Sequence, residues 1–135
     1  DGGLHGHITM TRELYAGATS KCEVTFEYDT RLKKIIKRIM EHYAISGSAN
    51  IQSIVNSSGE IIPFEINCRI SGTNSIRSHF GFKDVRYTLD EYLYGRKPEK
   101  AVITTGSAVR MLCDIIYPGR ALKDIFDGDD SFTIF

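Results

Sequence analysis

A length of 135 residues is enough for one domain with one hydrophobic core, and 41% hydrophobic and 25% charged residues are ordinary proportions for a globular protein. The 17 basic residues balance the 17 acidic ones, so no net charge favours nucleic acid or an anionic membrane as the main partner. No apolar run approaches the roughly 18 residues of a membrane helix, and a cytoplasmic location is therefore the expectation.

The first part of the chain predicts two strands. It opens on Asp1-Gly2-Gly3, a combination typical of a turn between strands, so we expect an upstream strand and a sequence that is part of a longer protein. A period-two alternation predicts a strand from His7 to Leu14 and a second from Lys21 to Tyr28. The segment Tyr15 to Ser20, with Gly17 and other small residues, is the expected connection.

The next segment predicts an amphipathic helix. Asp29 or Thr30 is the expected N-cap, and basic residues lie opposite an apolar stripe. The apolar stripe consists of Leu32, Ile35, Ile36, Ile39, Met40 and Tyr43. The basic face is typical either of a nucleic-acid stripe or of a solvated surface, and the absence of interleaved aromatic residues favours the solvated surface.

Two strand-like runs then predict a β-hairpin, Asn50 to Asn56 and Glu60 to Asn67. If Ser58-Gly59 is a two-residue turn, one face is apolar, and the other face pairs Gln52 with Glu65 and Asn50 with Asn67. The apolar pairs in this register are Val55 with Ile62, Ser53 with Phe64 and Ile51 with Ile66.

The polar face of this hairpin is a candidate metal site. Gln52, Glu65 and Asn67 would converge within reach of one or two small cations, and their oxygens suit Mg²⁺ (or Mn²⁺) held jointly with nucleotide phosphates. Arg69 extends the same face with a guanidinium suited to phosphate oxygens. Two alternatives stay open: the polar face is simply solvated, or a glycine bulge at Gly59 shifts the register and separates Gln52 from Glu65.

The remaining elements are shorter. A polar loop leads into a predicted helix from Asn74 to Phe80, whose start would offer backbone N–H groups to an anion. Thr73 is its available cap, and Gly81 ends it. The last elements are a helix between Asp84 and Tyr94 with Thr88 and Glu91 at capping-box spacing and Gly95 at its end, a strand from Ala108 to Tyr117, and a loosely held acidic stretch around Asp124 to Asp130.

Several of these segments together resemble the ATP-grasp enzymes. The run F-E-I-N-C-R-I-S-G at Phe64 to Gly72 contains the E-x-N-x-R signature. The N-I-Q strand before it, and S-G-T-N-S-I-R with Gly81-Phe82 after it, are similar to the large chain of carbamoyl-phosphate synthase and its smaller relatives. The resemblance covers most of Asp1 to Gly95. Cys68 stands where proline is common in that family, and the three cysteines, Cys22, Cys68 and Cys113, are expected to be reduced thiols.

The resemblance implies roles for individual residues. Glu65, Asn67 and Gln52 would bind the magnesium ions that bridge the ATP phosphates, and Arg69 would contact the phosphates as the catalytic arginine. Asn74, in the S-G-T-N-S-I-R stretch, is a further candidate for nucleotide binding. A looser match adds Arg12 and Lys21, and for Arg12 an ordinary surface arginine is the alternative.

The resemblance also implies a fold and an activity. The expected fold is α+β, an antiparallel sheet with helices packed on one face, with residues 1–135 forming a single domain as the C-terminal ATP-grasp lobe. The lobe with the lysines and the glycine-rich lid is not visible and is expected in cis or in trans, so the isolated chain should be inactive. With ATP, the whole enzyme would activate a carboxylate or bicarbonate as an acyl phosphate and join it to an amine or similar nucleophile. A catalytically silent module and one chain of a split-gene enzyme are the alternatives, and a homo-oligomer is open.

Overall fold

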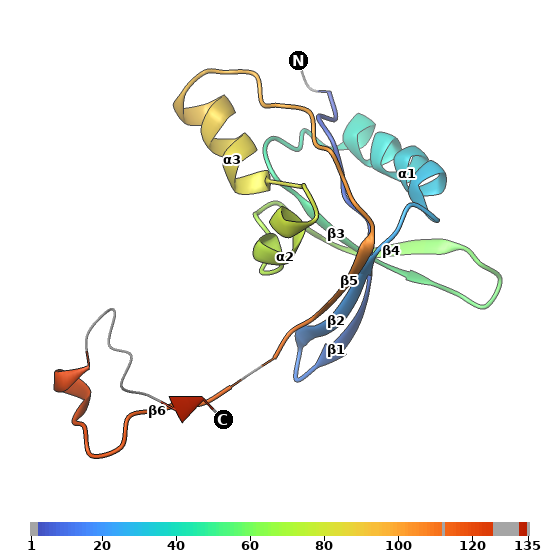
Figure 1. Cartoon of the computed structure of the whole chain (residues 1–135). Helices are drawn as coiled ribbons and strands as arrows, with labels where there is room; N and C mark the ends of the chain where they lie inside the picture. The colour runs from blue at the N-terminus through green and yellow to red at the C-terminus, as the bar shows by residue number, and fades with distance from the viewer. Residues whose placement is uncertain (1–2, 112, 126–132, 135) are drawn as a thin grey trace.

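The computed structural model describes residues 3–111, 113–125 and 133–134, and it is a mixed α+β structure with small antiparallel sheets and a few helices (Figure 1). The strands are β1 (Met10–Tyr15), β2 (Ala18–Val24), β3 (Asn50–Val55), β4 (Ile61–Asn67), β5 (Gly106–Val109), β6 (Ile115–Ile116) and β7 (Thr133–Ile134). The predicted α+β class is confirmed. In place of the one predicted sheet, the described residues form three, with strand orders β1-β2-β5, β3-β4 and β6-β7.

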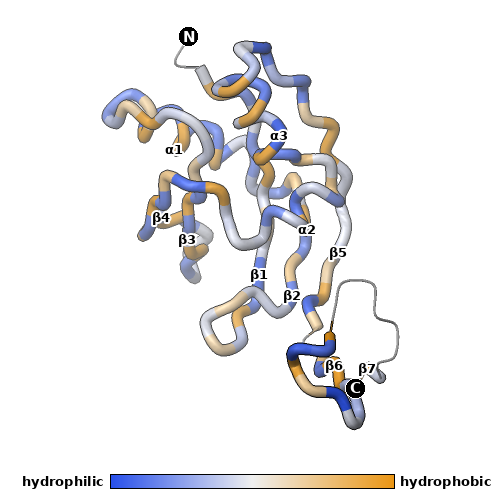
Figure 2. Tube along the Cα trace, turned by 90° about the vertical axis from the view of Figure 1, so that its left-hand side faces the viewer, coloured by the Kyte–Doolittle hydropathy of each residue, from blue (hydrophilic) through white to orange (hydrophobic). Residues whose placement is uncertain are grey.

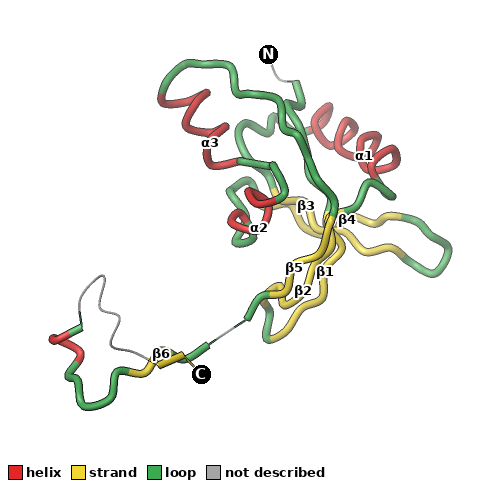
Figure 3. The backbone as a smooth tube through the Cα atoms, viewed as in Figure 1, coloured by secondary structure: helices red, strands yellow, loops and turns green. Residues whose placement is uncertain are grey.

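The helices are short except for the first. They are α1 (Asp29–His42), α2 (Asn74–His79), α3 (Asp84–Thr88), its π-helical continuation (Leu89–Leu93) and a 3₁₀ turn (Leu122–Asp124). Helix α1 lies apart from α2 and α3 (Figures 1 and 3). Within the described ranges, no helix has the length and apolar character needed to span a membrane.

The β1-β2 hairpin is tighter than predicted. Ala16 and Gly17, with φ of 48° and 78°, make a two-residue turn of the kind that matches the twist of hairpin strands. Because this turn is so short, β2 begins at Ala18 inside the segment predicted as a connection, and it ends at Val24, before the predicted Tyr28. Strand β1 correspondingly starts at Met10, later than the predicted His7.

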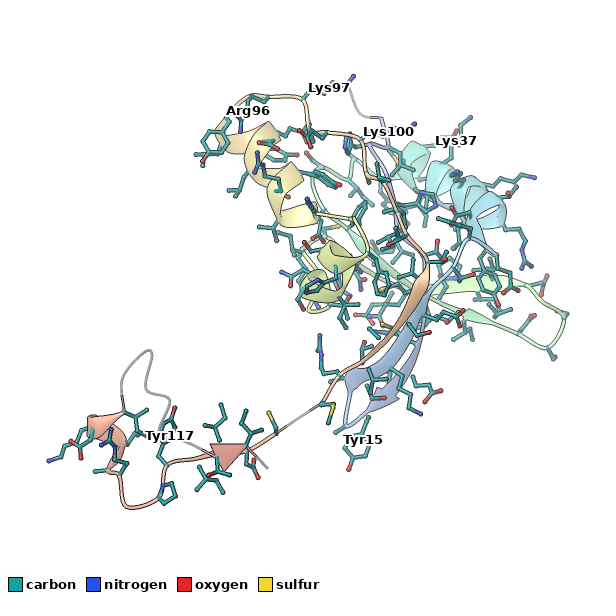
Figure 4. All side chains as sticks on the ribbon, in the orientation of Figure 1. Tyr15, Lys37, Arg96, Lys97, Lys100 and Tyr117 are labelled. Carbon is teal, nitrogen blue, oxygen red and sulfur yellow. The ribbon has the colours of Figure 1, made fainter. Side chains whose placement is uncertain are left out.

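Helix α1 confirms the strongest helical pattern but not its predicted cap. The helix starts at Asp29, and neither Asp29 nor Thr30 caps it, because Tyr28 takes the N-cap position without a side-chain hydrogen bond. The Asp29 carboxylate instead accepts a hydrogen bond of 2.8 Å from Thr9 Oγ1, which fastens the helix start to the segment before β1. Figure 4 shows Lys37 on the outer side of the helix, as expected for a solvated basic face.

The α2 and α3 region confirms both predicted terminating glycines and corrects both predicted caps. Gly81 and Gly95 follow the helices with φ of 91° and 59°, the left-handed conformation that glycine adopts freely. Thr73 makes no side-chain cap. Thr88 lies in mid-helix, where its hydroxyl donates 2.8 Å to the Asp84 carbonyl, so the predicted capping box with Glu91 is wrong.

The last part of the chain contains the short strands β5, β6 and β7. The predicted strand from Ala108 to Tyr117 is divided between β5 and β6, and the views from two sides show β6 lying away from the other sheets (Figures 1 and 2). Asp124 lies in the 3₁₀ turn, and most of the predicted acidic stretch, residues 126–130, is outside the described residues.

The apolar core of the described part is small. Of its apolar residues, Cys22 and Val24 on β2 are buried, at 5% and 1% exposure, because β2 is covered on both edges by β1 and β5. Many large apolar side chains remain exposed, among them Ile54, Ile62 and Phe64 on the β3-β4 hairpin. Among the described residues, the polar or charged ones that are buried outnumber the buried apolar ones; they are Thr19, Ser71, Thr73, Arg77, Asp84 and Asp90.

Candidate functional site

The open end of the β3-β4 hairpin has the predicted register, although its turn does not. Asn56 N donates 3.0 Å to Glu60 O, so the loop holds Ser57, Ser58 and Gly59, with φ of 81° at Gly59. This shifts the pairs next to the loop by one residue, and Val55 faces Ile61 instead of Ile62. Gln52 nevertheless pairs with Glu65, and Ser53 with Pro63, because Phe64 has no partner and forms a bulge.

The register shifts caused by the turn and by the bulge therefore cancel. The extra loop residue moves β4 by one position, and the bulge at Phe64 moves it back before the polar face begins. As a result, Gln52 faces Glu65 and Asn50 faces Asn67, as predicted, whereas the predicted pairs of Val55 with Ile62 and of Ser53 with Phe64 are wrong. The register shift at the Gly59 loop would by itself have separated Gln52 from Glu65, and the bulge at Phe64 in the same hairpin reverses it.

Gln52, Glu65 and Asn67 converge on one point. Gln52 Nε2 donates 2.6 Å to Glu65 Oε2, and Asn67 Nδ2 donates 2.6 Å to Glu65 Oε1. The Glu65 carboxylate thus lies between the two amides, and no ion pair of Glu65 occurs among the described residues. The side chains are on the accessible part of the hairpin, where a ligand can reach them.

This donor set fits a cation that phosphate oxygens help to hold. Rotation of either amide replaces its N–H group by its carbonyl oxygen, which would give one carboxylate and two amide oxygens, all hard ligands suited to magnesium. Over the ranges that the structure describes, there is no cluster of three or more His, Cys, Asp or Glu residues that could hold a metal by themselves. A cation at Glu65 would need nucleotide phosphates to complete its coordination.

Arg12 lies at this site and Lys21 does not. The Arg12 guanidinium, through Nη2, donates a hydrogen bond to Gln52 Oε1 and so connects β1 to the hairpin. Arg12 is paired with Cys22, and the adjacent pair, Glu13 with Lys21, faces the other side of the sheet. Lys21 is 3.4 Å from the Glu13 carboxylate on that opposite, exposed side.

The loop after β4 uses its polar groups internally. Arg69 Nη1 donates 3.1 Å to the Ile70 carbonyl, and the side chain is otherwise exposed. The predicted N–H groups for an anion are partly taken, because Asn74 N donates to Ser71 O at 3.0 Å and Thr73 N to Ser71 Oγ at 3.2 Å. Asn74 begins a helix of only six residues.

Arg77 is a residue of this region that the sequence did not single out. It is 8% exposed, and its Nη2 donates 2.5 Å to Asn50 Oδ1 while Nη1 is 3.5 Å from Asp84 Oδ2. Burial lowers the pKa of Arg77, the Asp84 carboxylate raises it in part, and the positive charge of Arg12 lowers it further. The one available sequence signal was its place in the S-G-T-N-S-I-R stretch, which does not distinguish a buried arginine from a surface one.

Comparisons of the chain with protein-family models, with curated proteins and with solved structures give no match.

Proposed function

We propose that the chain is the metal- and phosphate-binding half of an ATP-dependent ligase, corresponding to the C-terminal lobe of an ATP-grasp enzyme. The observation that supports this most directly is the convergence of Gln52, Glu65 and Asn67 on one accessible point. A hairpin with an irregular turn would ordinarily lose that alignment, and here a second irregularity restores it.

The proposed chemistry needs little from the protein beyond charge and position. A magnesium ion at Glu65, Asn67 and Gln52 would neutralise charge on the phosphoryl group that passes to a carboxylate or bicarbonate. Arg69, exposed beside this face, would stabilise the equatorial phosphoryl oxygens. The acyl phosphate would then react with an amine or similar nucleophile bound with the help of the complementary lobe, present in cis or in trans.

The hydrogen bond between Arg12 and Gln52 would couple metal binding to phosphate binding at this site. Gln52 Oε1 accepts a hydrogen bond from Arg12, and a cation bound to that oxygen would repel the guanidinium, because both are positively charged. The released Arg12 would be free to bind a phosphate oxygen, and metal binding would thereby recruit a second phosphate contact. Lys21, on the other side of the sheet, has no part in this arrangement.

The hydrogen-bonded set around Glu65 also supports a second candidate, a catalytically silent binding module. Two amides satisfy the carboxylate without any metal, as they would on a merely structural polar face. ATP hydrolysis discriminates between the two, because a silent module needs no cation at Glu65.

The test compares ATP hydrolysis by the full-length protein with that of its Glu65→Ala variant. Loss of the one carboxylate ligand should lower kcat by about 100-fold or more, since a metal acting on the transferring phosphoryl group contributes several kcal/mol. Glu60→Ala is the matched control, because Glu60 lies in the same hairpin but bonds to Asn56 beside the loop. Equal rates for Glu65→Ala and wild type, with an active enzyme, would remove the proposed role of Glu65.

A further inference from the structure

Two arginines orient the side-chain amides on the polar face of β3. Arg77 Nη2 donates 2.5 Å to Asn50 Oδ1, and Arg12 Nη2 donates to Gln52 Oε1. A guanidinium has N–H donors and no acceptor, so each amide must turn its oxygen toward its arginine. The NH₂ group of each amide therefore faces away from the arginine, and that of Gln52 donates 2.6 Å to Glu65 Oε2.

The two arginines differ in how easily they can move away from these amides. Arg12 is exposed, and a cation at Gln52 would repel it into solvent. Arg77 is 8% exposed, and its Nη1 lies 3.5 Å from Asp84 Oδ2. Separation of Arg77 from Asn50 would leave a buried donor without its acceptor, which is unfavourable. Gln52 can therefore turn its oxygen toward a metal, whereas Asn50 keeps its NH₂ group toward the site.

The NH₂ group of Asn50 is open to a ligand. Within the described part of the chain, Asn50 Nδ2 makes no hydrogen bond, and it is not one of the buried atoms that lack a partner. Asn50 is paired with Asn67, so Glu65 is its diagonal neighbour across the hairpin, at roughly 7–8 Å. Because a bond from Mg²⁺ to oxygen is about 2 Å long, this interval can hold an ion at Glu65 and one phosphate group.

The charges around this face set a condition for anion binding. Without a metal, the positive charges of Arg12 and Arg77 are balanced by the negative charges of Glu65 and Asp84. A magnesium ion at Glu65 would add two positive charges. A phosphate group should therefore bind here together with the metal and not alone.

We propose that Asn50 is a further ligand-binding residue, which donates a hydrogen bond from Nδ2 to an oxygen of the metal-bound phosphate group, and that Arg77 is the positioning residue that orients its amide. This assignment rests on the proposed metal site at Glu65. Two amides on one strand face thus have different roles. Gln52 offers its oxygen to the metal, and Asn50 offers its N–H group to the phosphate.

The test follows the side-chain NH₂ signals of the ¹⁵N-labelled whole chain by NMR during titration with magnesium tripolyphosphate. The Asn50 signals should shift as the ligand binds. Magnesium alone should leave the Asn50 signals in place even where it shifts those of Gln52, and sodium tripolyphosphate should leave both in place. Asn56 is the internal control, because its Nδ2 is bonded to Glu60 beside the hairpin loop, and its signals should not move.

The Asn50→Asp variant separates ligand binding from a structural role. Aspartate keeps an oxygen for Arg77, but it loses the NH₂ donor and adds a negative charge. The variant should bind magnesium tripolyphosphate about tenfold to hundredfold more weakly in calorimetric titration, because a hydrogen bond to a charged group is replaced by repulsion. A residue that served only to hold Arg77 would tolerate this change.

Ser57→Asp is the matched control for the added charge. Ser57 is exposed in the loop of the same hairpin, so this variant should bind magnesium tripolyphosphate as wild type does. If Asn50→Asp does not fold, the NMR titrations of the wild-type chain decide the question without it.

Three results would overturn the proposal. The first is the absence of a shift of the Asn50 signals on addition of magnesium tripolyphosphate. The second is a shift of these signals with magnesium alone, which would make Asn50 a metal ligand. The third is equal or tighter binding of magnesium tripolyphosphate by Asn50→Asp. Failure of the ligase function is a different result, in which ATP hydrolysis is unchanged in Glu65→Ala while Asn50 still responds to magnesium tripolyphosphate.

Discussion

At the residue scale, Arg77 and Asp84 form the most deeply buried ion pair in the described part of the chain, with side chains 10% and 4% exposed. The same guanidinium also holds Asn50 at the start of β3. One side chain thus fixes α2, α3 and the polar face of the hairpin relative to each other. Its loss would leave a buried carboxylate without its cation, which costs more than the pair itself contributes.

The Arg77→Met variant should therefore be about 3 kcal/mol less stable than wild type, close to the cost of breaking a buried ion pair from one side. The measurement is urea unfolding followed by circular dichroism. Lys37→Met is the control, because Lys37 is exposed and 3.9 Å from Glu41, and it should change stability by less than about 0.5 kcal/mol. Similar losses of unfolding free energy in both variants would show that the buried ion pair stabilises the fold no more than an exposed one does.

Asp90 is a second residue whose ionised form is favoured by neighbouring side chains. Burial opposes ionisation of this carboxyl, but hydrogen bonds from Arg96 and Arg86, together with the two positive charges, lower its pKa below the usual value. Arg96 Nη2 is 2.6 Å and Arg86 Nε 3.0 Å from its oxygens. Because the pKa is lower in the folded state, the unfolded state binds the proton more readily.

The stabilisation from Asp90 is therefore present above the ordinary carboxyl pKa and is lost as the pH falls through the lower pKa of the folded state. The Asp90→Asn variant should melt below wild type near pH 7, and the difference in Tm should shrink on acidification. Melting curves across this pH range measure it. A difference that does not change with pH would mean that the ionised form of Asp90 has no stabilising role.

At the element scale, Gly81 and Gly95 end two helices but differ in the space around them. Both have positive φ, but a Cβ on Gly81 would lie 1.9 Å from the Val102 carbonyl oxygen, whereas Gly95 has open space. The end of α2 is held against the segment before β5, where Thr104 N also donates 3.1 Å to Phe80 O. This contact joins α2 to the three-stranded sheet.

The Gly81→Ala variant should accordingly lose about 3 kcal/mol or more of unfolding free energy. The alanine must adopt a strained φ, and the neighbouring backbone must also move. Gly95→Ala is the matched control, with the φ penalty alone, and should cost about 1 kcal/mol. Chemical unfolding of both variants gives the comparison. If the two glycines cost the same, the close approach of α2 to Val102 does not contribute to stability.

The hairpin shows which parts of an element a sequence can predict. Alternation placed Gln52, Glu65 and Asn67 on one face, and the structure brings them together. The same reasoning gave the wrong turn and the wrong pairs near it, because a Gly59 loop and an unpaired Phe64 leave no mark on a period-two pattern and offset each other. The sequence did not predict the buried position of Arg77 or the hydrogen bond from Arg12 to Gln52. Both depend on contacts between distant elements, which a local pattern does not encode.

At the scale of the whole molecule, the apolar burial of the described residues is concentrated at β2. Its Val24 is 1% exposed and Cys22 is 5% exposed, and both lie where β2 is paired on its two edges. The end segment with β6 and the 3₁₀ turn extends away from this region in both views (Figures 1 and 2). Stability should therefore depend on β5 and hardly at all on this end segment.

Two truncations test this division. A chain that ends at Met111 keeps β5 and the bond from Arg110 N to Ser20 O, and its stability should be within about 0.5 kcal/mol of the full chain. A chain that ends at Thr105 lacks β5, uncovers Val24 and should lose about 2 kcal/mol or more, the value of burying one aliphatic side chain. Urea unfolding of the three chains compares them directly. A large loss already at Met111 would mean that the end segment packs on the rest, and an unchanged midpoint at Thr105 would mean that β5 does not protect the core.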